Sequence, residues 1–112
     1  MTLSLEDLHV EDGAEVAVEH IPTALTAAGF AYDDGATQRF EPGGDTTYVE
    51  HGRPTRGTWY LDDDGRFWSF WPPSYRACYD LRWIVENGMI VGLSFVEVRR
   101  QSRFDGRYQV PR

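Results

Sequence analysis

The feature that most constrains this chain is a series of turn-forming segments that divides residues 37–112 into short pieces. Glycine, proline, asparagine and aspartate accept the tight or positive-φ backbone of such turns. The expected turns are Pro42-Gly43-Gly44-Asp45, His51-Gly52-Arg53-Pro54, Asp62-Asp63-Asp64-Gly65, Pro72-Pro73-Ser74, Glu86-Asn87-Gly88 and Asp105-Gly106. The aromatic and β-branched residues between them are typical of strands. The pattern predicts an antiparallel meander with strands at residues 38–40, 46–50, 57–61, 66–71, 76–85, 89–99 and 107–110.

A meander of this size has two unpaired edges, and closure into a barrel removes both of them. The chain has 112 residues, of which 41% are hydrophobic, which suits one domain with its own core. We therefore expect a mainly β fold, a meander that closes into a small barrel, over residues 37–110. Residues 1–30 are expected to form a helical or mixed cover. An α+β fold with a curved sheet is the alternative.

The N-terminal segment favours short helices. Ser4 and Asp7 have the spacing of a helix start. Asp12-Gly13 is compatible with a hairpin turn, but we expect a short helix followed by a strand near residues 14–18. Pro22 suits the first turn of a second helix, which is expected to run to residue 28 and to end at Gly29.

Charge is distributed unevenly along a chain whose formal net charge is −7. Residues 1–38 contain eight acidic side chains and no basic one, whereas residues 99–112 contain five arginines and one aspartate. Opposite potentials favour contact between the two ends, within one chain or across a homodimer. The acidic body disfavours nucleic acid as a partner. Every basic residue is an arginine, which excludes Schiff-base chemistry through lysine.

The cysteine content and the length of the apolar runs bear on where in the cell the protein is located. Cys78 is the single cysteine, so no internal disulfide can form. No apolar run approaches the ~20 residues of a membrane-spanning helix, and the acidic N-terminus does not resemble a secretory signal. These features predict a cytoplasmic protein that is not embedded in a membrane.

The segment 76–85 alternates clearly between two faces. One face carries apolar and aromatic residues, and the other carries Arg76, Cys78, Asp80 and Arg82. In one interpretation the polar face meets solvent. In the other it lines a polar pocket inside the barrel, where Asp80 and Arg82 would orient a polar group of a ligand.

Gly57-Thr58-Trp59 at the start of an expected strand resembles the G-x-W tripeptide of lipocalin-like (calycin) β-barrels. Residues 46–108 are also similar to small, uncharacterised lipocalin-like domains of bacteria. The tripeptide lies in mid-chain here, instead of in the first strand, and the chain is short for such a barrel. The resemblance implies a ligand-holding barrel in which Arg99 or Arg100 stacks on Trp59. It also implies a small apolar or amphiphilic ligand, and in a minority of relatives isomerase, cyclase or decarboxylase activity.

Candidate site residues follow from aromatic density and from titratable groups near it. Aromatic rings cover flat apolar ligands, while their N–H and O–H groups find polar partners. The expected ligand-binding residues are Tyr48, Trp59, Trp68, Trp71, Tyr79, Arg82 and Trp83. His51 and Asp80 are the candidate acid–base residues. The three histidines lack metal-ligand spacing, so we expect neither a metal nor a cofactor.

Three functions remain open from the sequence. The leading hypothesis is a small-molecule-binding protein that holds an apolar or aromatic ligand in a barrel pocket. The first alternative is a cofactor-free acid–base enzyme, such as an isomerase, cyclase or dehydratase, that uses the same pocket. The second is a protein-interaction or dimerisation module in which exposed aromatic residues and the arginine-rich end contact an acidic partner.

Overall fold

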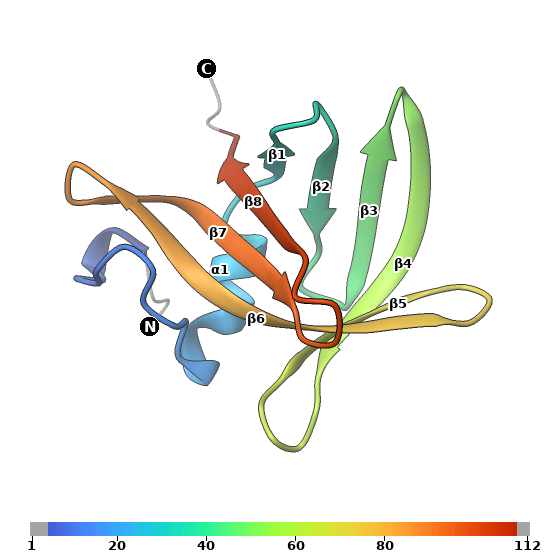
Figure 1. The fold of residues 1–112 in the computed structure, drawn as a ribbon, viewed down its shortest axis with the longest axis horizontal. Helices are drawn as coiled ribbons and strands as arrows, with labels where there is room; N and C mark the ends of the chain where they lie inside the picture. Colours follow the sequence, from blue (N-terminus) through green and yellow to red (C-terminus); the bar gives the residue numbers. More distant parts are fainter. Residues whose placement is uncertain (1–4, 110–112) are drawn as a thin grey trace.

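A computed structural model describes residues 5–109 and has a closed antiparallel barrel in which sequential strands are neighbours and β8 pairs with β1 (Figure 1). The fold is mainly β, as the turn pattern predicts. The strands are β1 (Phe30–Tyr32), β2 (Thr37–Phe40), β3 (Asp45–Glu50), β4 (Arg53–Leu61), β5 (Phe67–Trp71), β6 (Tyr75–Glu86), β7 (Met89–Glu97) and β8 (Arg103–Tyr108).

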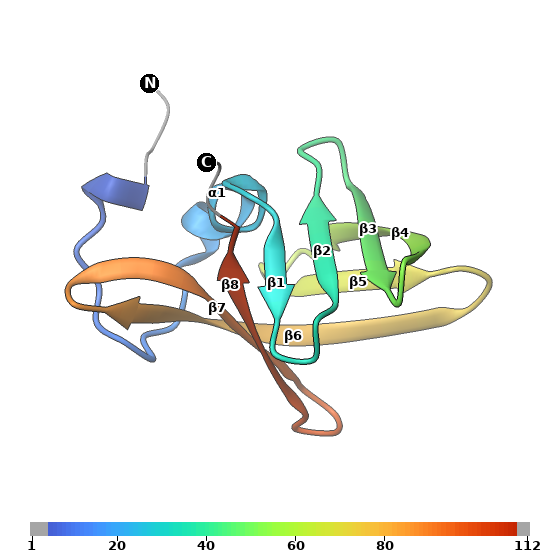
Figure 2. The ribbon, with the colours of Figure 1, turned by 90° about the horizontal axis from the view of Figure 1, so that it is seen from above.

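Helix α1 (Ile21–Thr26) covers one end of the barrel, which we call the closed end. Figure 2 shows α1 on the same side as the β2–β3 loop and opposite the β1–β2 turn. Its apolar face is buried at Ile21, Ala24 and Leu25, and the Tyr108 hydroxyl donates a hydrogen bond to the Ala24 carbonyl at 2.5 Å. The helix thus belongs to the core, although it is shorter than the expected span of 22–28.

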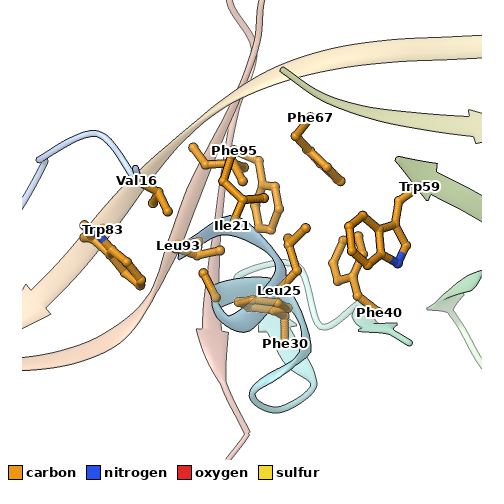
Figure 3. Close-up of a cluster of buried hydrophobic side chains, with 12 residues drawn as sticks. Val16, Ile21, Leu25, Phe30, Phe40, Trp59, Phe67, Trp83, Leu93 and Phe95 are labelled. Atoms are coloured by element: carbon orange, nitrogen blue, oxygen red, sulfur yellow. The ribbon is translucent and has the colours of Figure 1, made fainter. Parts of the chain in front are cut away.

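The core continues from α1 into the barrel, as Figure 3 shows. Leu25 and Phe30 are fully buried. The Phe30 ring lies with its centroid 5.9 Å from that of Phe40 and 5.5 Å from that of Phe95, both edge to face. Such ring pairs add to the stabilisation that burial provides. The core therefore connects the helix at the closed end with the aromatic rings inside the barrel.

The segment before α1 lies along part of β6. The Val16 N–H donates to the Leu81 carbonyl and the Trp83 N–H to the Ala14 carbonyl, each at 2.9 Å. Because β5 pairs only with Tyr75–Tyr79 of β6, the rest of that strand edge would otherwise be open. We expected a strand at 14–18; the structure reduces it to a single bridge between Glu15 and Arg82. A 3-10 turn at Leu5–Asp7 replaces the first helix, whose expected start at Ser4 lies outside the described residues.

Three details of the predicted meander are wrong. Strand β4 begins at Arg53, so Arg53 and Pro54, which were expected in a turn, belong to the strand. Strand β1 was not expected, because its three residues give too short a pattern to detect. The expected turn at Asp105-Gly106 lies inside β8, and the chain turns instead at residues 98–102, after β7. Packing favours a glycine at position 106: a Cβ there would lie 3.0 Å from Cδ1 of Phe30 and 3.1 Å from Cε1 of Tyr32, closer than most contacts of this kind.

The acidic and basic ends of the chain lie near each other through backbone pairing. Strand β8 pairs with β1, and the Gln109 N–H donates to the Gly29 carbonyl at 2.8 Å. The ion pairs described for the arginine-rich end use other partners: Arg107 contacts Glu86 at 2.6 Å and Arg103 contacts Asp105 at 2.8 Å. These exposed pairs contribute little stability.

Candidate functional site

The end of the barrel opposite α1 contains a cavity of about 390 Å³. We call this the open end; it carries the β1–β2, β3–β4, β5–β6 and β7–β8 turns. Among the described residues, nine aromatic side chains line the cavity: Tyr32, Phe40, Tyr48, Phe67, Trp71, Tyr75, Tyr79, Phe95 and Phe104. The remaining lining residues are Asp34, Gln38, Thr55 and Ser69. The volume lies within the range of about 300–1,000 Å³ that small-molecule sites occupy.

A chain of hydrogen bonds fixes the polar groups on one wall. The Tyr32 hydroxyl donates to Oε1 of Gln38 at 2.7 Å, and Nε2 of Gln38 donates to Oγ1 of Thr46 at 3.0 Å. The Thr46 hydroxyl then donates to the Arg39 carbonyl at 2.9 Å. Burial raises the pKa of Tyr32. This wall therefore presents an oriented, neutral phenol to the cavity.

Tyr48 and Glu50 lie on the same face of β3, and the Tyr48 hydroxyl donates to Oε2 of Glu50 at 3.1 Å. Desolvation, together with this hydrogen bond and the negative charges of Glu50 and Asp34, raises the pKa of Tyr48 to about 12. Asp34, in the β1–β2 turn, accepts the Ala36 N–H at 3.0 Å through Oδ1, so its carboxylate is held in an Asx turn.

The opposite wall is built by β5, in which Phe67, Ser69 and Trp71 point inward. The Trp71 indole N–H donates to Oγ of Ser69 at 3.2 Å. Burial raises the pKa of Tyr79, and a hydrogen bond with Ser69 opposes this shift. Ser69 thus connects two aromatic residues of the cavity through hydrogen bonds.

Of the ligand-binding residues expected from the sequence, Tyr48, Trp71 and Tyr79 line the cavity. Trp59 and Trp83 are buried in the core instead. Trp68 and Arg82 lie on the outer surface of the sheet: Trp68 stacks on Tyr60, with 6.4 Å between centroids, and Arg82 donates to the Gly13 carbonyl at 3.1 Å.

The candidate acid–base residues do not line the cavity. His51 is exposed in the β3–β4 turn with φ of 51°. Asp80 is exposed on β6, whose inward face carries Leu81 and Trp83. The polar face of this strand therefore meets the exterior, and the interpretation that placed it in a polar pocket is wrong. Cys78, on the same outer face, is largely buried, which raises the pKa of its thiol despite the opposing charge of Arg66.

Sequence reasoning missed most of the cavity, including Tyr32, Gln38 and Phe95. The signal was present in the period-two alternation of each strand. In β5 the inward positions are Phe67, Ser69 and Trp71, whereas Trp68 points outward. Selecting residues by strand face, instead of by ring size, would have recovered more of the lining.

The Gly-x-Trp tripeptide adopts a defined position in the barrel. Trp59 lies on β4 against Phe40 and Phe67, and its indole N–H donates to the Glu41 carbonyl in the β2–β3 loop at 2.9 Å. That loop is at the closed end. The cation–π contacts described for this chain are those of Arg76 over Tyr60 and Phe70; Arg99 and Arg100 are exposed in the turn after β7.

Within residues 5–109 no group of three or more histidine, cysteine or carboxylate side chains is arranged to hold a metal ion. No helix in this part of the chain is long and apolar enough to cross a membrane. Comparison of the sequence and structure with protein-family models, curated proteins and solved structures finds no match.

Proposed function

We propose that this protein binds a small apolar or aromatic molecule in the cavity at the open end of the barrel. The observation that carries the proposal is the contrast between the two ends: α1 fills one, and the other holds a cavity of about 390 Å³ surrounded by aromatic side chains. A binding site needs an apolar wall with a few oriented polar groups. Tyr32, Gln38 and Ser69 supply those groups.

The position of Trp59 supports a lipocalin-like barrel as the ancestry of this site. In lipocalin-like barrels the tryptophan of the G-x-W tripeptide packs near the closed end. Trp59 lies at that end here, and its indole N–H donates a hydrogen bond to the Glu41 carbonyl. The missing stacked arginine is a departure from that family's pattern. We assign the protein to the cytoplasm, because Cys78 is a free thiol.

Binding is favoured over acid–base catalysis by the contents of the cavity. His51 and Asp80 both lie outside it. The hydroxyls of Tyr32, Tyr48 and Tyr79 are held neutral chiefly by burial, and at Tyr48 also by the hydrogen bond to Glu50, so they suit recognition better than proton transfer near neutral pH.

The test uses N-phenyl-1-naphthylamine, a neutral aromatic probe whose fluorescence rises in an apolar site. We expect saturable binding by the purified protein. Trp71→Ala, which removes a cavity wall, should weaken binding at least fivefold. Trp68→Ala, on the outer face of the same strand, is the matched control and should change binding less than twofold. Equal effects of the two substitutions, or no saturable binding, would refute the cavity as the site.

Native mass spectrometry of freshly purified protein gives an independent check. Extra mass that is lost on denaturation would support the proposal and report the size of the bound molecule. Loss of that mass in Trp71→Ala, with retention in Trp68→Ala, would place the molecule in the cavity. Its retention in both variants would argue against the cavity.

A further inference from the structure

The charge of the cavity lining is negative. Of the described residues that line it, Asp34 is the only one with a charged side chain. Glu50 adds a second carboxylate, which lies beside Tyr48 and accepts the hydrogen bond from its hydroxyl. Burial is the main cause of the raised pKa of Tyr32 and Tyr48, and the negative charge of Asp34 adds to the shift at both hydroxyls.

The ion pairs described for this part of the chain include neither Asp34 nor Glu50, although Arg53 lies opposite Glu50 in the β3–β4 pairing. Arg103, at the start of β8, is paired with Asp105 at 2.8 Å. Arg99 and Arg100 are exposed in the turn after β7, where their backbone N–H groups donate to Oε2 of Glu97. Glu97 is itself buried, and its charge makes a small addition to the raised pKa of Tyr79, which is caused mainly by burial. Negative charge thus acts on the cavity tyrosines from three strands or turns.

Next to Asp34, three aromatic rings meet at steep angles. The Tyr32 and Tyr48 ring centroids are 6.2 Å apart with planes inclined at 48°, and those of Tyr48 and Trp71 are 6.5 Å apart at 73°. All three rings line the cavity, where a cation would meet their π-faces, which carry the negative part of the ring quadrupole. Aromatic cages recognise quaternary ammonium groups through cation–π attraction to the ring faces.

We propose that the ligand is an organic cation: an amine or quaternary ammonium group held among Tyr32, Tyr48 and Trp71 beside Asp34, with an apolar body directed toward Phe67 and Phe95. The inference rests on the proposed binding function and specifies the ligand class for the same cavity. A neutral ligand would use the apolar rings but not the carboxylates. An anionic ligand would be repelled by both Asp34 and Glu50.

The experiment compares three probes of similar shape by displacement of N-phenyl-1-naphthylamine and by calorimetry. They are benzyltrimethylammonium, the neutral 2-methyl-1-phenylpropan-2-ol and the anion phenylacetate. We expect the cation to bind at least tenfold more tightly than the alcohol, and phenylacetate to bind most weakly. Asp34→Asn should weaken the cation about fivefold and leave the alcohol within twofold, because the amide oxygen can still accept the Ala36 N–H.

Asp33→Asn is the matched control, since Asp33 is an exposed acid in the same turn that does not line the cavity. It should leave all three affinities within twofold. Alcohol or phenylacetate binding as tightly as the cation overturns the organic-cation proposal while leaving the binding function intact. Equal weakening by Asp33→Asn and Asp34→Asn also overturns it, since only a diffuse charge effect would remain. Failure of the naphthylamine and of all three probes overturns the binding function itself.

Discussion

Gly57 lies against the indole ring of Trp71. A Cβ atom at position 57 would be 2.6 Å from Cε3 of Trp71 and 2.6 Å from the carbonyl oxygen of Phe70. The glycine of the Gly-Thr-Trp tripeptide is therefore needed for close approach, and it allows a cavity wall to lie flat against β4. Its neighbour Trp59 packs at the closed end, so one short segment of β4 helps to build both ends of the barrel.

Gly57→Ala should both destabilise the fold and weaken ligand binding. The added methyl group has to displace the Trp71 ring and the backbone of β5, and such overpacking typically costs about 1–3 kcal/mol. Urea unfolding measures the loss of stability, and naphthylamine fluorescence measures the change in the cavity. Gly43→Ala is the control, because a Cβ at that position meets no atom within 4 Å. Equal stability of the two variants would contradict the proposed packing of Trp71.

Leu25→Ala should destabilise the barrel through its closed end. Leu25 is fully buried in α1, and replacing a buried leucine by alanine typically costs about 2–5 kcal/mol. Met89→Ala, at a side chain that is 68% exposed, should change stability by less than about 0.5 kcal/mol. Thermal and urea unfolding test both values. A small effect of Leu25→Ala would mean that α1 is not an integral part of the core.

The sequence predicted the barrel better than the site, for a physical reason. Turns are local: Asn87 and Gly88 have φ of 52° and 76°, which their side chains tolerate, so Asn-Gly is informative without knowledge of the rest of the chain. The cavity is not local. It depends on which strand face points inward, and that becomes clear only when all the strands are placed together.

Gly106 illustrates the limit of local reasoning. After an aspartate, it has the pattern of a turn, yet it lies within β8, opposite Tyr32 of β1, and Phe30 and Tyr32 occupy the space that a side chain there would need. No nearby residue carries that information. Asp80 and His51 were selected for chemistry alone, and the barrel places both outside the cavity.

Asp12→Ala should loosen the N-terminal segment from β6. Oδ1 of Asp12 accepts the Val85 N–H at 2.9 Å, next to the bulge between Ile84 and Val85. Loss of this charge-assisted hydrogen bond should cost about 1 kcal/mol and speed amide exchange at Val85. Hydrogen exchange followed by NMR measures that effect. Glu11→Ala removes a neighbouring exposed acid and should leave Val85 protected; equal exchange in the two variants would show that the Asp12 contact is unimportant.

Stability should fall at alkaline pH because of the tyrosines of the barrel. Burial raises the pKa of Tyr32 and Tyr108, and that of Tyr48 is raised to about 12 from an ordinary value of 10.0. Since these folded-state values exceed the unfolded ones, the native state retains protons that the unfolded chain releases above about pH 10. Their contribution is complete below pH 10 and declines as the pH rises toward 12. Phenolate absorbance at 295 nm, recorded during urea unfolding at pH 8 and pH 11, tests this.

Tyr48→Phe distinguishes the contribution of one hydroxyl to that decline. The phenyl ring preserves the contact with Trp71, whose centroid is 6.5 Å away, but it removes a group that releases its proton earlier in the unfolded chain. The variant should therefore lose less stability than the parent between pH 10 and pH 12. Tyr60→Phe, on the outer face of β4, is the control. An identical alkaline decline in Tyr48→Phe and the parent would show that the Tyr48 pKa is not raised by its surroundings in the barrel.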